Sequence, residues 1–194
     1  MLPVSSGAGT LGVTGHRDLR PEDLGALEGA VSDLIAQVNP SPSWSLLSSL
    51  AEGADRLVAR VALDHGARLM VVLPMDSQVY ESDFPTPASI AEFRALLVRA
   101  EAVETLPWSM VEPRSLAYAR AGSVVAARSD VLAALWDGIA SGKAGGTSEL
   151  VRWCLGAASE GMPPQRPACR VAHLRTPRQS CPDVAHPFSI DWLA

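Results

Sequence analysis

Glycine, threonine and arginine are the residues of this sequence whose types and spacing favour the binding of a phosphate. The segment GKAGGTSEL at 142–150 follows an apolar run and precedes a helical pattern. Gly145 and Gly146 would let backbone amides approach a ligand, and Thr147 is expected to cap the helix. Because free amides at a helix N-terminus attract anions, this segment predicts a phosphate-binding loop; the alternative is a flexible connection with an ordinary cap.

A second polar loop, TGHRDL at 14–19, also follows an apolar run. Gly15 permits close approach of the backbone, and Arg17 offers a planar guanidinium that matches phosphate or carboxylate. His16 could hydrogen-bond a base or a sugar, or carry a proton. We expect all three residues at the ligand site; the alternative is an exposed loop in which His16 only packs.

The third loop lies within SSLAEGADRLVA at 48–59. Glu52 and Gly53 stand where a strand turns into a helix, and this combination would suit sugar hydroxyls. The negative charge of Asp55 near the helix start would interact favourably with the helix macrodipole, so a purely structural role is the alternative for this loop. We expect Glu52 and Gly53 to shape the sugar and base side of the site.

A fourth loop, MDSQVYESDF at 75–84, carries two aromatic residues. Tyr80 and Phe84 could stack on a base or close a lid. The alternative is that both pack the loop onto the edge of a sheet.

Three further patterns lead to no site. GAGTLG at 7–12 spells a dinucleotide fingerprint but precedes a strand, whereas the fingerprint must follow one. GIASGK at 138–143 lacks the spacing of a P-loop and the hydroxyl after its lysine. No metal and no cofactor is therefore expected, since the remaining candidates match no familiar zinc framework: Cys169, His173, Cys181 and His186.

The elements that must position these loops alternate along the chain. Continuous apolar strands separated by helices predict an α/β fold with a mainly parallel sheet covered by helices on both faces. Ligands of such sheets bind at the carboxyl ends of strands, where the polar loops gather. Strands are expected at 10–14, 44–50, 68–73, 104–107 and 130–136, and helices at 21–38, 53–65, 87–100, 115–128 and 148–160.

Length and composition fit one domain. The chain has 194 residues, of which 47% are hydrophobic. We expect a loose lead-in at 1–9, a domain at 10–161, and a Pro/Arg-rich arm at 162–194 that adds at most one edge strand at 169–174. Three cysteines without tight pairing and no membrane-length apolar run predict a cytoplasmic protein without a membrane partner.

The charge balance also bears on partners. The chain has 16 basic and 21 acidic residues, a net charge of −5, and Lys143 is its sole lysine. An anion site must therefore be built mainly from arginines and backbone amides. The negative balance disfavours nucleic acid as a partner, because non-specific affinity for nucleic acid comes from neutralised phosphates.

Taken together, four segments resemble one family. GVTGHRDL, LAEGADRLVA, VVLPM followed by YESDF, and SDVLAALWDG followed by GGTSELV are similar in order and spacing to the SLOG superfamily, over roughly residues 10–160. The superfamily is named for the DNA-processing protein DprA and the LOG-type phosphoribohydrolases. The resemblance implies a Rossmann-like three-layer sandwich that binds a nucleotide or a nucleotide-derived ligand, as a ligand-sensing domain, and pairing into a homodimer.

The resemblance leaves other functions open. In LOG-type enzymes a glutamate and an arginine serve hydrolysis of the N-glycosidic bond of a nucleoside 5′-monophosphate, which would give those roles here to Glu149 and Arg120. Glu149 lies two residues after Thr147, where the enzymes place their glutamate three after, and Leu150 occupies that position. A DprA-like DNA-binding module and an interaction module that senses a partner enzyme's product are the remaining alternatives.

Overall fold

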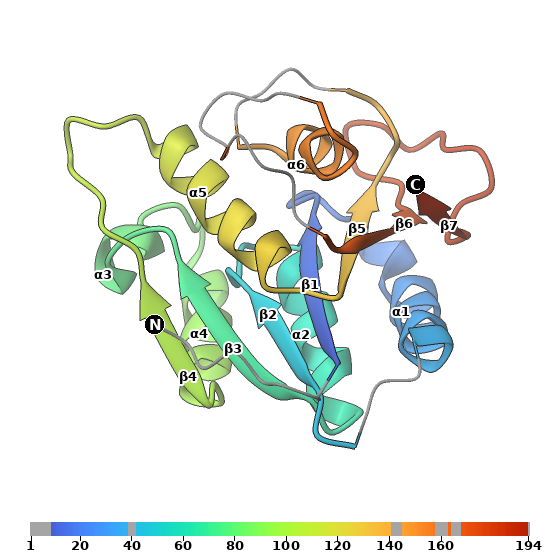
Figure 1. The fold of residues 1–194 in the computed structure, drawn as a ribbon, viewed down its shortest axis with the longest axis horizontal. Coiled ribbons are helices and arrows are strands. Elements are labelled where there is room, and N and C mark those ends of the chain that lie inside the picture. The colour runs from blue at the N-terminus through green and yellow to red at the C-terminus, as the bar shows by residue number, and fades with distance from the viewer. Residues whose placement is uncertain (1–8, 39–41, 141–144, 158–162, 164–167, 194) are drawn as a thin grey trace.

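The computed structural model describes residues 9–38, 42–140, 145–157, 163 and 168–193, which form a single β-sheet with helices on both faces (Figure 1). The strands are β1 (Thr10–Gly15), β2 (Ser45–Ser48), β3 (Arg68–Leu73), β4 (Ala102–Thr105), β5 (Val131–Trp136), β6 (Arg170–Arg175) and β7 (Ile190–Leu193). Their order is β4-β3-β2-β1-β5-β6-β7. Only the last pair is antiparallel. The predicted α/β fold with a mainly parallel sheet is confirmed.

The helices divide between the two faces of the sheet (Figure 1). A 3-10 turn (Pro21–Asp23) leads into α1 (Leu24–Val38), and α2 (Ala54–Asp64), α3 (Ser77–Glu81), α4 (Pro87–Val98), α5 (Arg114–Ala127) and α6 (Thr147–Cys154) follow. Side chains of α1, α2 and α4 share one apolar core, whereas those of α5 and α6 share the other. The segment 75–86, which was expected to be a loop, contains the short helix α3.

Continuous apolar strands arise because both faces of the sheet are covered. Val71 and Val72 are neighbours on β3, and both are fully buried. Val71 points into the core beside α2 and Val72 into the core beside α5. Burying each valine side chain contributes roughly 1.5–3 kcal/mol relative to exposure. The sheet therefore holds the strand ends in fixed positions.

The C-terminal segment differs from the expected arm. It supplies two strands to the sheet, and β6 lies inside it between β5 and β7, in register with Ala133 opposite Ala172. The edge strand on this side of the sheet is β7, whose four residues show no regular alternation of burial. Parts of four expectations lie outside the described residues: 1–8 of the lead-in, 142–144 of the phosphate loop, 158–160 of the helix expected at 148–160, and 162 with 164–167 at the start of the arm.

Candidate functional site

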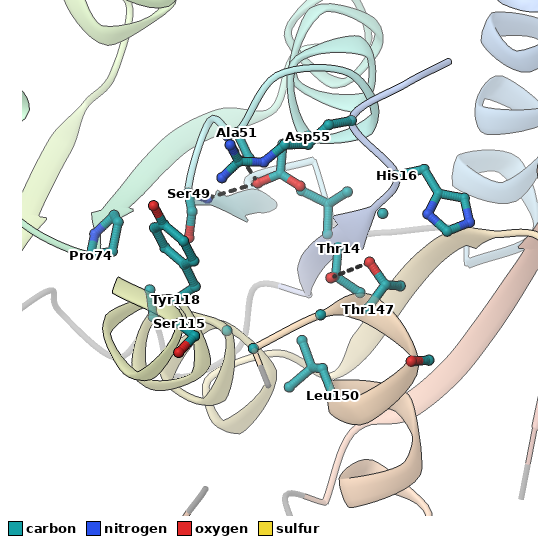
Figure 2. Close-up of a pocket in the computed structure, with 18 of the residues that line it drawn as sticks. Thr14, His16, Ser49, Ala51, Asp55, Pro74, Ser115, Tyr118, Thr147 and Leu150 are labelled. Carbon is teal, nitrogen blue, oxygen red and sulfur yellow. Dashed lines mark hydrogen bonds between the residues drawn. The ribbon is translucent and has the colours of Figure 1, made fainter. Parts of the chain in front are cut away.

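A cavity of about 740 Å³ opens at the carboxyl ends of β1, β2 and β5. Its walls come from the loops after these strands, from α5 and from the first turn of α6 (Figure 2). The structure brings six of the predicted site residues to this cavity: Gly15, His16, Arg17, Gly145, Gly146 and Thr147.

The first turn of α6 borders the cavity. Gly145 has a positive φ of 74°, and a Cβ there would lie 2.4 Å from the carbonyl oxygen of Ser115 on α5. Only glycine fits this close approach. The helix begins at Thr147, so its N-cap is Gly146, which has no side chain, and not Thr147. The positive end of the helix therefore borders the cavity, and Glu149 is the acidic residue of its first turn.

The Thr147 side chain has a different contact from the predicted one. The Thr14 hydroxyl donates a hydrogen bond to Oγ1 of Thr147 across the cavity wall, with the oxygens 3.4 Å apart (Figure 2). This bond joins the end of β1 to the start of α6. Thr14, Gly146 and Thr147 all line the cavity.

Gly15 and Gly53 allow the loop that follows β1, called the β1 loop below, to pack closely against α2. A Cβ on Gly53 would lie 2.5 Å from the carbonyl oxygens of both His16 and Arg17, and its φ is 83°. The amide of Ala54 donates to the His16 carbonyl at 3.0 Å. A Cβ on Gly15 would lie 2.4 Å from that of Ala54. These contacts fix the backbone that carries His16 and Arg17.

Glu52 and Gly53 do not line the main cavity. They line a second hollow of about 440 Å³ on the other side of the β1 loop, which shares Arg17 and Asp18 with the first. The structure therefore separates Glu52 and Gly53 from the glycine turn at Gly145. They lie next to the cavity and do not form its sugar side.

Arg17 is an unpaired cation at the mouth of the cavity. Its side chain is exposed, and its guanidinium lies 5.4 Å from the centre of the Tyr118 ring. It forms no ion pair with any residue in the described ranges, whereas most of the arginines there pair with a carboxylate. Its positive charge is therefore available to a ligand.

His16 is held in its neutral form. Its Nε2 accepts a hydrogen bond from the amide of Asp137 at 3.0 Å, so the ring proton lies on Nδ1. Oδ1 of Asp137 lies 3.2 Å from the same nitrogen. Burial lowers the pKa of His16 and outweighs the attraction of Asp137, which raises it. At neutral pH His16 is a hydrogen-bond donor, not a cation.

Asp137 and Arg178 form an ion pair that sequence reasoning missed. Burial raises the pKa of Asp137, but the amide of Ile139 at 2.9 Å, the electrostatic interaction with His16, and the hydrogen bond and charge of Arg178 hold it below its usual range. Nε of Arg178 lies 2.8 Å from Oδ2 of Asp137. The only signal for Arg178 in the sequence was the arginine content of the supposed arm.

Gln179 and Ser180, which follow Arg178, fasten the C-terminal segment to the β1 loop. The backbone amide of Gln179 donates to the Asp18 carbonyl at 2.9 Å, and the side-chain Nε2 of Gln179 donates to the Leu19 carbonyl at 2.9 Å. The Ser180 hydroxyl donates to Asp18 at 2.7 Å. A segment about 160 residues away in sequence thus supports one wall of the cavity.

Asp55 is the second residue that sequence reasoning undervalued. It lines the cavity although only 5% of its surface is exposed. Burial raises the pKa of this carboxyl to about 6, against hydrogen bonds from Ala51 and Ser48 and the charge of Arg17, which lower it. A carboxylate that is buried beside a cavity has a stronger claim to function than one that only favours a helix dipole.

The two aromatic residues of the fourth loop belong to the apolar core. Tyr80 and Phe84 are buried, and their rings meet edge-to-face with centres 5.1 Å apart and contact Phe93. Of the two expected alternatives, packing is the one observed; neither ring forms a lid. The buried Tyr80 also borders the cavity, and Tyr118 on α5 is the half-buried aromatic residue of the cavity wall (Figure 2).

The two residues considered for hydrolysis stand outside the cavity. Residues Ser115, Tyr118 and Gly122 of α5 line it, and Arg120 does not; Arg120 forms an ion pair with Glu112. Glu149 is also absent from the lining, although its neighbours Thr147 and Ser148 belong to it. The structure therefore does not bring Glu149 and Arg120 together at the ligand cavity.

Two further features concern metals and membranes. Among the described residues no three histidine, cysteine or acidic side chains gather as ligands of a metal ion would. His173, one of the zinc candidates, is buried with Nε2 3.0 Å from the Trp136 carbonyl oxygen. Within the same ranges, every helix is too short or too polar to span a bilayer.

The sheet order and the cleft at its carboxyl ends define a Rossmann-like α/β protein. No protein-family model matches the chain, and no curated protein matches it. The fold is similar to a structure of DNA processing protein A (DprA) from Streptococcus pneumoniae, with 16% identity, coverage of 65% of this chain and 41% of that one, and a TM-score of 0.45.

A second similar structure, of DprA from Helicobacter pylori, is described by its single-stranded DNA binding mode. It has 16% identity, covers 66% of this chain and 53% of that one, and gives a TM-score of 0.44. The chain thus spans about half the length of these proteins or less.

The expectation that disfavoured nucleic acid as a partner is corrected. The finding is that a protein with a similar structure is described by its single-stranded DNA binding mode. A net charge of −5 for the whole chain does not exclude a local site for nucleic acid. The physical reason is that net charge averages over the whole surface. Many carboxylates here are paired with arginines, while Arg17 at the cavity mouth has no such partner in the described chain.

Proposed function

We propose that this protein binds a nucleotide unit in the cavity above β1, β2 and β5, through the phosphate of that unit. One observation carries the proposal: Arg17, which has no ion-pair partner in the described chain, and the first turn of α6 line the same cavity. A helix N-terminus and a guanidinium each favour a phosphate, and together they supply donors from two sides.

The other lining residues suit the rest of a nucleotide. The volume of about 740 Å³ falls within the range of small-molecule sites. The ring of Tyr118 offers a face on which a base could stack, a contact that every base accepts. Neutral His16 would donate a hydrogen bond from Nδ1 to a phosphate or sugar oxygen of the ligand. Binding of such a ligand would make the cleft a sensing site.

A nucleotide unit comes from two sources, a free nucleotide or a single strand of nucleic acid. The same phosphate, sugar and base would be recognised in either case. Binding of a strand would add contacts to further phosphates and would weaken steeply with salt, whereas a mononucleotide would show a shallow dependence. N-glycosidic hydrolysis is not carried forward, because Glu149 and Arg120 lie off the cavity.

The test is calorimetric titration of the purified chain. The ligands are the four ribonucleoside 5′-monophosphates and a short single-stranded DNA oligonucleotide, each at two salt concentrations. Loss of one charge-assisted contact costs roughly 1.5–3 kcal/mol, so Arg17→Ala should weaken binding by about 10-fold or more. Arg99→Ala is the matched control, because Arg99 is exposed and distant from the cavity lining.

Equal affinities of wild type and Arg17→Ala would remove Arg17 from the site. Absence of binding to all five ligands would refute the proposed function. Stronger binding of the oligonucleotide, with a steep salt dependence, would assign the site to single-stranded nucleic acid.

A further inference from the structure

The two oxygens of the Asp55 carboxyl group have different environments. Oδ2 accepts three hydrogen bonds, from the Ser48 hydroxyl at 3.2 Å, the Ser49 amide at 3.2 Å and the Ala51 amide at 3.4 Å. No described residue donates to Oδ1. In Figure 2, dashed lines join one oxygen to Ser49 and Ala51, and the other oxygen points away from both.

Oδ1 is not sealed inside the protein. The fully covered side-chain polar atoms without a partner, within the described chain, belong to Asp23, Arg56, Arg68 and Trp136, and Asp55 is not among them. Asp55 lines the main cavity. A side chain that is 95% buried thus presents one unpaired acceptor to the ligand space. Once a ligand covers this acceptor, leaving it without a donor would be costly, so a hydrogen-bond donor on the ligand is favourable there.

The strand order sets which part of a nucleotide reaches this oxygen. Asp55 follows β2 and the glycine turn at Gly146 follows β5, and β1 lies between the two strands. Neighbouring strands are spaced by about 4.8 Å, so the two walls stand on the order of 10 Å apart. A phosphate held at Gly146 fills the near half of this span. The sugar, which is bonded to the phosphate, is then the next group to face Asp55.

We propose that Oδ1 of Asp55 accepts a hydrogen bond from a ribose hydroxyl of the bound nucleotide, so that the cleft selects ribonucleotides over their deoxy forms. This inference rests on the proposed function and names the substrate class of the same site. A site built to hydrogen-bond a hydroxyl strongly rejects the analogue that lacks it, because its own polar group is left unpaired.

Asp55→Asn tests the proposal with little change of shape. Its amide oxygen would still accept from Ser48, Ser49 and Ala51, while the NH₂ group would replace the acceptor at Oδ1 by a donor. Asp64→Asn is the matched control, since Asp64 is an exposed carboxylate at the far end of the same helix. Thermal unfolding of both variants would verify that they are folded.

The measurement is the affinity of each protein for ribonucleoside 5′-monophosphates and for their 2′-deoxy and 3′-deoxy forms. In wild type and Asp64→Asn, one deoxy series should bind about 10-fold more weakly than the ribonucleotides. In folded Asp55→Asn this difference should disappear, through weaker binding of the ribonucleotides.

Two results would overturn the proposal and leave the proposed function standing. The first is equal affinity of wild type for ribonucleotides and both deoxy series. The second is a ribose preference that persists in Asp55→Asn. Failure of wild type to bind any mononucleotide or DNA oligonucleotide would instead refute the proposed function itself.

Discussion

The imidazole of His16 and the backbone amide of Asp137 are joined by a hydrogen bond 3.0 Å long, in which the amide donates to Nε2. The same nitrogen lies 3.2 Å from the Asp137 carboxylate. Protonation of His16 would give an ion pair with this carboxylate but would break the bond from the amide. The pairing of these two residues therefore makes the charge of His16 depend on the groups around Asp137.

We expect Arg178→Gln to raise the pKa of His16. Burial is the largest influence and lowers this pKa, and the charge of Arg178 lowers it further, while Asp137 raises it. Removing Arg178 leaves the Asp137 carboxylate free to attract the imidazolium. Titration of the His16 ring protons by NMR would measure the midpoint, with Arg152→Gln as an exposed control outside the cavity lining. An unchanged midpoint in Arg178→Gln would contradict this electrostatic coupling.

Loss of the Arg178 side chain should also destabilise the protein. The Asp137 carboxylate is fully buried, so Arg178→Ala leaves it without its ion-pair partner. A hydrogen bond to a charged group contributes roughly 1.5–3 kcal/mol, and we expect a loss of that order in the free energy of unfolding.

The control for this loss is Arg175→Ala, which removes a half-exposed ion pair with Asp191 from the same segment. Such surface pairs contribute at most about 1 kcal/mol. Urea unfolding of both variants would compare them, and equal losses would show that burial of Asp137 does not matter.

Gly145→Ala should be more harmful than Gly66→Ala. Both glycines have similar positive φ angles, 74° and 78°, so alanine pays a similar backbone cost of roughly 1–2 kcal/mol at each. A Cβ at Gly66 meets nothing within 4 Å, whereas one at Gly145 would lie 2.4 Å from the Ser115 carbonyl oxygen. The larger loss of unfolding free energy should therefore appear at Gly145, together with weaker phosphate binding. Equal losses at the two positions would refute the close approach of α5 and the glycine turn.

The stability difference between Asp55→Asn and wild type should depend on pH. The pKa of Asp55 is raised from 3.8 to about 6 in the folded state, so the folded protein holds this proton more tightly than the unfolded chain. Wild type therefore loses stability as pH rises from about 4 to 6, by on the order of 2–3 kcal/mol. The variant has no such proton to lose. Unfolding free energies measured at pH 4 and pH 7 should show that the variant becomes more stable relative to wild type at the higher pH. A difference between the two proteins that is the same at both pH values would contradict the raised pKa.

Local sequence patterns were sufficient for the fold class and for the loops that form the cavity. The apolar runs at 68–73 and 130–136 became β3 and β5 because strands buried on both faces need continuous apolar sequence. Gly145 and Arg17 were found from residue type and position after a strand. Parallel strands end at one edge of a sheet, so those loops had to meet.

The tertiary structure decided which side chains reach the cavity. It placed Arg178 there from a C-terminal segment that returns to the β1 loop, and periodicity carries no information about such a distant contact. It placed Glu52 in the lining of a neighbouring hollow. It placed Arg120 outside the lining of the main cavity, in an ion pair with Glu112. It also gave the oxygens of Asp55 different partners. A sequence determines which elements form, but orientation and burial of a side chain depend on how those elements pack.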